Sequence, residues 1–108
     1  MAELAVSLIV VLGHSKCGAV KSALKHIDAK DSLPGAINGL VELLKPAVTR
    51  SKAMAGDTLA NAITQNVKDG VAKLQQLEPI VAPAVKAGKV KVVGGVYDLK
   101  TGRVTLAT

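Results

Sequence analysis

Residues 8–18 read Leu8-Ile9-Val10-Val11-Leu12-Gly13-His14-Ser15-Lys16-Cys17-Gly18, and this stretch decides the fold. An unbroken apolar run of this kind is typical of a parallel strand buried in an α/β protein. The glycine that ends the run is followed by a turn that carries a histidine and the only cysteine of the chain. Ligands of α/β proteins bind where such strands end at their carboxyl side. The sequence therefore predicts a strand over residues 8–12 and a functional turn directly after it.

His14 and Cys17 are the candidate metal ligands, because imidazole and thiolate are side chains that zinc prefers. A catalytic zinc needs three protein ligands and a structural zinc needs four. The chain has no second cysteine. His26 lies about two turns into the helix expected from Gly18, some 12 Å away at roughly 1.5 Å per residue. The sequence thus offers two good zinc ligands and no evident third.

The remaining residues of this turn have a structural interpretation. Gly13, Ser15 and Gly18 are expected to form the turn, since glycine adopts backbone conformations that other residues avoid. The spacing of His14 and Cys17 alone also fits a turn histidine beside a small buried thiol with no metal. A redox function for the cysteine is a third interpretation, for which the chain lacks a resolving cysteine.

Length and composition favour one α/β domain over residues 1–108. Such a length supports a single modest core. Hydrophobic residues make up 49% of the chain, and Tyr97 is the only aromatic residue. A core of small aliphatic side chains favours close packing of helices on a sheet over a β-sandwich.

The charge and the apolar runs bear on partners and location. The net charge of +6 comes from scattered lysines without interleaved aromatic residues, so we expect a solvated basic surface and no nucleic-acid partner. No apolar run approaches the roughly 18 residues that a membrane span requires. The N-terminus has an acidic residue, Glu3, and no basic segment, so we expect no signal peptide. A cytoplasmic location is the favoured expectation.

Apolar spacing predicts the order of elements along the chain. Residues 1–6 resemble the end of a helix, and further helices are expected over 18–27 and 35–45. Pro46 is expected to kink or interrupt the second of these, with a looser connection over 49–56. Asp57 is a good N-cap for a long helix that reaches Leu74. A short helix over 80–87, a strand over 89–96, a turn over 98–102 and an edge strand over 103–107 complete the prediction.

The two strand-like runs are expected to lie in one sheet. Residues 8–13 and 90–96 are separated by helical segments, and such a crossover connection joins parallel strands. We therefore predict that these runs are parallel neighbours, with helices on the faces of the sheet. Tyr97 and Asp98 are expected to anchor the hairpin that follows, and not to act as an acid–base pair.

The motif Gly13-His14-Ser15-Lys16-Cys17-Gly18-Ala19-Val20 resembles the second zinc motif of the β-class carbonic anhydrases. Residues 66–67, 79–81 and 94–104 resemble the closing helix, strand and hairpin of that family, including its Tyr-Asp-Leu-x-Thr-Gly ending. The resemblance covers nearly the whole chain in order. It implies an α/β fold that is part of a parallel sheet flanked by helices, with a short C-terminal edge strand.

The resemblance also implies an activity and a metal. In this family His14 and Cys17 would each donate to zinc, and the enzyme would reversibly hydrate carbon dioxide to bicarbonate. A sulfur analogue of carbon dioxide is a second substrate that the sequence leaves open. Members of the family are built from dimers, so a homo-oligomer is expected.

The chain departs from the family at one place. Members carry an earlier Cys-x-Asp-x-Arg motif that supplies another cysteine ligand and an Asp–Arg pair, and no segment of this chain resembles it. We therefore expect a truncated form that needs a missing N-terminal segment, with no identifiable catalytic residue, doubtful zinc occupancy and impaired activity in the chain as given. The alternative function is a non-catalytic assembly or binding subunit that retains the C-terminal half of the fold.

Overall fold

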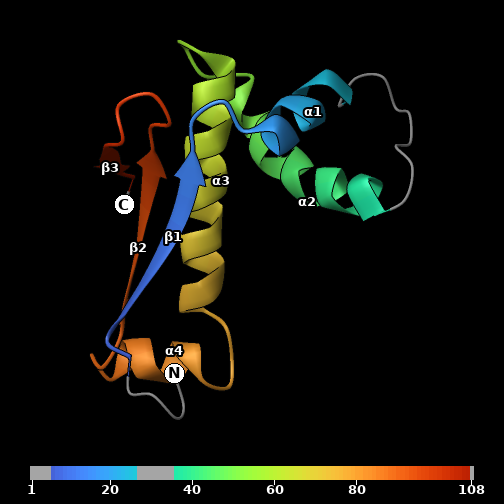
Figure 1. The fold of residues 1–108 in the computed structure, drawn as a ribbon. Helices are drawn as coiled ribbons and strands as arrows, with labels where there is room; N and C mark the ends of the chain where they lie inside the picture. Colours follow the sequence, from blue (N-terminus) through green and yellow to red (C-terminus); the bar gives the residue numbers. More distant parts are fainter. Residues whose placement is uncertain (1–5, 27–35, 108) are drawn as a thin grey trace.

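The computed structural model describes residues 6–26 and 36–107. Along the chain these form β1 (Leu8–His14), α1 (Gly18–His26), α2 (Ala36–Ser51), α3 (Thr58–Gln75), α4 (Val81–Lys86), β2 (Lys91–Tyr97) and β3 (Val104–Leu106) (Figure 1). The mixed α/β architecture predicted from the sequence is confirmed. The helix end expected over residues 1–6 falls almost wholly outside the described residues. No helix in the described ranges is long and apolar enough to cross a membrane.

The sheet has the order β1-β2-β3. β1 and β2 pair in parallel along their whole length, from Leu8 opposite Lys91 to His14 opposite Tyr97. This confirms the predicted pairing of the two runs. β3 is antiparallel to the carboxyl end of β2 and forms the expected edge strand. The turn after β1 and the hairpin after β2 therefore lie at the same end of the sheet (Figure 1).

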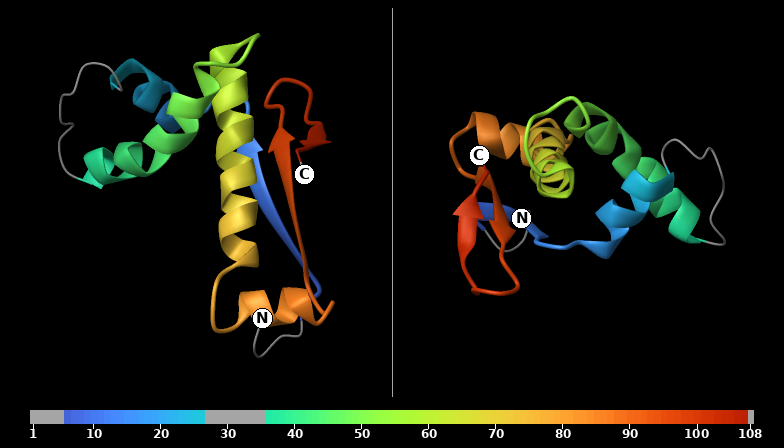
Figure 2. Two further views of the ribbon diagram at one scale, coloured as in Figure 1. Left: turned by 180° about the vertical axis from the view of Figure 1, so that it is seen from behind. Right: turned by 90° about the horizontal axis from the view of Figure 1, so that it is seen from above.

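The long helix α3 begins at its predicted cap. Asp57 Oδ1 accepts hydrogen bonds from the backbone N–H groups of Leu59 at 3.0 Å and Ala60 at 3.3 Å. These bonds satisfy donors that the first turn of a helix otherwise leaves unpaired. The buried stripe of α3 then follows helical spacing, and it consists of Ala62, Ile63, Val67 and Val71. This stripe packs α3 against β1 and β2 along one face of the sheet (Figure 2).

α3 approaches the sheet closely at Gly13. A Cβ atom at this position would lie 2.7 Å from Val67 Cγ2 and 3.3 Å from Ile63 Cγ2. Both neighbours are β-branched, and their side chains have little rotameric freedom within a helix. Gly13 is thus required by the packing of α3 on β1.

The helix α2 differs from the sequence prediction. It runs through Pro46 and ends at Ser51, so the connection expected over 49–56 starts only after that residue. The proline is exposed, whereas Val48 and Ser51 are fully buried. Ser51 Oγ also donates to the carbonyl of Ala47 at 2.7 Å. Burial of the next turn offsets the backbone hydrogen bond that the proline cannot make.

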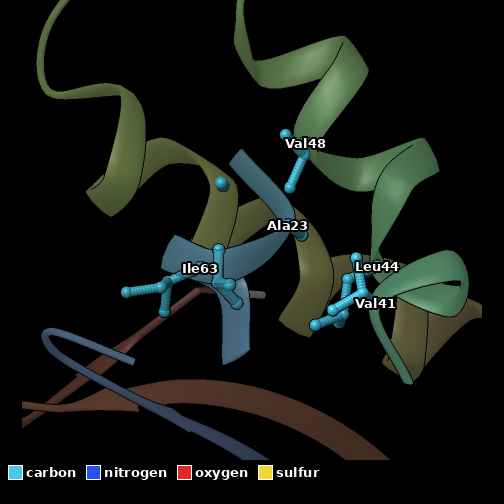
Figure 3. Packing of buried hydrophobic residues seen from close by; sticks show 7 residues of the cluster. Ala23, Val41, Leu44, Val48 and Ile63 are labelled. Atoms are coloured by element: carbon cyan, nitrogen blue, oxygen red, sulfur yellow. The ribbon is translucent and has the colours of Figure 1, made fainter. Parts of the chain in front are cut away.

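Among the described residues, two groups of aliphatic side chains form the core. The first joins α1, α2 and α3 and consists of Val20, Ala23, Val41, Leu44, Val48, Ala62 and Ile63 (Figure 3). The second lies between α3, α4 and the sheet and is centred on Val71, Val90 and Val92. The helices α1 and α2 project together from the end of α3 that begins near Asp57 (Figure 1).

The other face of β1 is open among the described residues. Leu8, Val10 and Leu12 are each more than half exposed. The backbone of Ser7 accepts from Lys91 N–H, and Ser15 N–H donates to β2 as well, so alternate residues of the strand bond to β2. The N–H and C=O groups of Leu8, Val10 and Leu12 therefore point to the outer edge. β1 presents an open edge and an open apolar face at the same residues.

We expect Gly13→Ala to lower the free energy of unfolding by about 1–3 kcal/mol, the usual cost of overpacking a core. Gly18→Ala is the matched control, because a Cβ at Gly18 meets no atom within 4 Å and alanine is favoured over glycine in a helix. The control is expected to equal or slightly exceed the parent protein in stability. Urea unfolding of the three chains measures the difference, and equal midpoints for both variants would contradict the packing argument.

Candidate metal centre

The turn after β1 is short and places both candidate ligands at its ends. His14 is the last residue of β1, and Cys17 directly precedes α1. The carbonyl of Cys17 accepts from Lys21 N–H at 3.0 Å and so starts the helical hydrogen-bond pattern. The left-handed residue of the turn is Lys16, with φ of 54°, and neither of the flanking glycines has a positive φ. The backbone freedom of glycine is therefore not what forms this turn.

The imidazole of His14 is exposed and its orientation is defined. Its Nδ1 lies 3.0 Å from the carbonyl oxygen of Ser15. A carbonyl oxygen can only accept, so Nδ1 is the donor in this hydrogen bond. The neutral ring then has Nε2 available as a metal ligand, which is the arrangement that a backbone carbonyl commonly fixes in metal-binding histidines.

Cys17 is a free cysteine of intermediate exposure. It packs against the core cluster that joins α1, α2 and α3. One side of this residue is thus held by the core, while His14 lies at the end of the open face of β1. Both candidate ligands lie at the junction between β1 and α1.

Ser15 connects this turn to the hairpin after β2. Its N–H donates to the carbonyl of Tyr97 at 2.8 Å, and its Oγ accepts from the N–H of Leu99 at 2.9 Å. Asp98 closes the hairpin through Oδ1, which accepts from Lys100 N–H at 2.8 Å. The prediction that Asp98 anchors the hairpin is confirmed, and Tyr97 contributes its backbone carbonyl to the bond with Ser15. The bond from Leu99 to Ser15 was not predictable from local sequence, because it spans 84 positions.

The described part of the chain holds no group of three or more His, Cys, Asp or Glu side chains suited to a metal ion. The side chain of His26 lies outside the described residues. Two cavities of about 290 Å³ and 260 Å³ border the turn and share Ser15, Thr64 and Val96 in their walls. Neither cavity is lined by His14 or Cys17. The donor types of His14 and Cys17 fit zinc, and these are two candidate donors, fewer than the three that a catalytic zinc requires.

Comparison with known protein sequences gives one consistent result. The family described as "Carbonic anhydrase" matches residues 1–104. A relative named "Carbonic anhydrase" from Mycolicibacterium smegmatis is 36% identical over 103 residues, which cover 95% of this chain and 50% of the relative. "Carbonic anhydrase 2" from Mycobacterium tuberculosis is 34% identical over 102 residues, with coverage of 94% and 49%. The chain spans about half the length of the curated relatives it matches.

Comparison with solved structures agrees. The β-carbonic anhydrase CcaA superimposes with a TM-score of 0.75 at 27% identity, covering 95% of this chain and 48% of that protein. A tetrameric β-carbonic anhydrase of Sordaria macrospora superimposes with a TM-score of 0.79 at 24% identity, with coverage of 97% and 54%. The second match supports the fold alone. The described fold is therefore that of about half of a β-carbonic anhydrase chain.

A metal titration tests the two candidate ligands. Cadmium bound by a thiolate gives an ultraviolet charge-transfer band, and we expect this band to be absent in Cys17→Ser. In His14→Ala the band is expected to persist with an affinity at least about tenfold lower, since loss of even an indirect ligand contact has an effect of this size. His26→Ala is the matched control and should titrate like the parent chain. Equal affinity in His14→Ala and the parent would exclude His14 as a ligand.

Proposed function

Because the chain belongs to the carbonic anhydrase family and has a fold of the β class, we propose that it forms part of a zinc-dependent enzyme that reversibly hydrates carbon dioxide to bicarbonate. The observation that carries this proposal is the turn at the carboxyl end of β1. There His14 and Cys17 flank two residues, and the carbonyl of Ser15 orients the imidazole. Imidazole and thiolate are both ligands that zinc prefers.

In this proposal His14 binds the metal through Nε2 and Cys17 through Sγ. Zinc, when bound, supplies Lewis-acid chemistry that makes hydroxide available from water at neutral pH. The residues of this chain hold the metal and fix the direction of its ligands. His14 is oriented by its hydrogen bond to Ser15 O, and Cys17 is fixed by the start of α1 and by the core beside it.

Two donors are fewer than the three that a catalytic zinc requires. The proposal therefore includes a second polypeptide segment that contributes the remaining donors. The open edge of β1 is the binding position that we propose for this contributor. A segment that pairs in parallel with Leu8, Val10 and Leu12 would have its carboxyl end beside His14, because parallel strands end at the same edge of a sheet. A segment like the family's Cys-x-Asp-x-Arg motif would bring a cysteine and an Asp–Arg pair to that position.

A non-catalytic assembly subunit is the second candidate function. The open face of β1, with Leu8, Val10 and Leu12 each more than half exposed, favours association whether or not a metal is bound. Exposed apolar patches commonly mark protein interfaces. Zinc content separates the two candidates, since the enzyme requires near-stoichiometric metal in the assembled protein and the assembly subunit does not.

Carbon dioxide hydration is expected to be very low for this chain alone. We expect activity to return when the chain is mixed with the half of the Mycolicibacterium smegmatis relative that it does not match, and with zinc. Stopped-flow hydration assays measure this, with His14→Ala and Cys17→Ser as inactive controls and His26→Ala as the matched active control. Robust activity of the chain alone, lost in both ligand variants, would show that its own residues complete the site.

Self-association through the open face of β1 is the second test of assembly. We expect the chain alone to form dimers or larger species at micromolar concentration, and Val10→Lys to shift the population towards monomer because it places a charge in the apolar face. Leu77→Lys is the matched control. Leu77 is also about half exposed, but it lies in the loop between α3 and α4, outside β1. Sedimentation velocity distinguishes the species. A folded monomer of the parent chain would contradict this part of the proposal.

A further inference from the structure

We propose that Ser15 is a positioning residue through which the hairpin after β2 sets the direction of the His14 imidazole. The relevance of this link to a metal rests on the function proposed above, whereas the link itself rests on the hydrogen bonds of the described residues. It makes the hairpin, residues 98–103, part of the support of the candidate ligand. None of these hairpin residues is itself a candidate ligand.

All three polar groups of Ser15 have partners. The N–H donates to Tyr97 O at 2.8 Å, and Oγ accepts from Leu99 N–H at 2.9 Å. The carbonyl oxygen accepts from His14 Nδ1 at 3.0 Å. Two of these bonds attach Ser15 to the end of β2 and the hairpin, and the third attaches the imidazole to Ser15. The direction of the Ser15 carbonyl is therefore fixed by residues far away in the sequence.

The hairpin is a firm support because it is closed by its own hydrogen bonds. Asp98 N–H donates to Arg103 O at 2.8 Å, and Gly102 N–H donates to Asp98 O at 2.8 Å. Asp98 Oδ1 accepts from Lys100 N–H at 2.8 Å. Gly102 adopts a φ of 75°, which glycine reaches without strain. The N–H of Leu99 is thus presented to Ser15 by a loop with little conformational freedom.

The chemical consequence concerns which ring nitrogen carries the proton. A carbonyl oxygen accepts a hydrogen bond, so it selects the form of His14 with the proton on Nδ1 and leaves Nε2 for a metal. Lys16, the next residue of the turn, has an uncommon left-handed backbone conformation. The turn therefore needs stabilising contacts at this residue as well. When the Oγ of Ser15 is removed, the Leu99 bond is lost, and we expect the Ser15 peptide to rotate more freely.

Two matched variants isolate the hydroxyl. Ser15→Ala keeps the backbone N–H and C=O groups and removes only the acceptor of Leu99. Ser15→Thr retains a hydroxyl at the same position and should restore the parent behaviour. Ser7→Ala is the control, since Ser7 is an exposed serine just before the same strand and no candidate ligand depends on it.

The first measurement is nitrogen NMR of the His14 ring in the metal-free chain. We expect the parent, Ser15→Thr and Ser7→Ala chains to hold the proton on Nδ1, and Ser15→Ala to shift towards a mixture of the two tautomers. The second is the cadmium titration, in which Ser15→Ala should bind about tenfold more weakly at the same charge-transfer wavelength. A merely structural role would lower the thermal midpoint without changing the tautomer.

A further variant acts from a distance and covers the case in which Ser15→Ala does not fold. Asp98→Ala removes the hairpin acceptor without touching Ser15 or either candidate ligand, and it should shift the His14 tautomer in the same direction by a smaller amount. An unchanged tautomer in every folded variant overturns the proposal. If no chain binds cadmium while the tautomer still shifts, the positioning role stands and the metal-binding function proposed for His14 and Cys17 fails.

Discussion

The structure depends on the parallel pairing of β1 with β2. Strands that run in the same direction need a crossover connection, and the part of the chain that the structure describes between β1 and β2 supplies α1, α2, α3 and α4 for it. The close contact of Gly13 with Val67 of α3 holds this crossover on the sheet. Because His14 pairs opposite Tyr97, the turn with the candidate ligands and the terminal hairpin are brought to one edge. Without this register, Ser15 has no hairpin to bind.

The same pairing leaves the sheet one-sided among the described residues. Parallel sheets are ordinarily covered on both faces, and α3 covers only the face of Ile9 and Val11. On the other face, the side chains of Leu8, Val10 and Leu12 are exposed, and their backbone groups point to an unpaired edge. An exposed edge with apolar side chains is a template for another strand. β1, the strand that ends at His14, is thus the described strand on which a further strand would pair.

Features with local signals were predictable from the sequence. The apolar run of β1, the cap at Asp57 and the closing turn of the hairpin each depend on neighbouring residues, and each was predicted with nearly the observed bounds. The end of α2 was not, because Pro46 signals a break locally while burial of Val48 and Ser51 continues the helix. The glycines of the turn likewise suggested a left-handed backbone at Gly13 or Gly18, whereas the left-handed residue is Lys16. In α2, tertiary contacts overrode the local signal.

The candidate site also has features that the sequence predicts and features that only the fold creates. The spacing of His14 and Cys17 on one turn is visible in the sequence, whereas the bonds of Ser15 require β1 and β2 to be paired first. Under the proposed function this order has a thermodynamic consequence. Two donors bind zinc weakly, and further donors arrive only when a segment pairs with the open edge of β1. Metal affinity and strand pairing are then linked, because a ligand that binds the assembled form preferentially stabilises that form. Each event strengthens the other, so the sheet and the metal site are completed together.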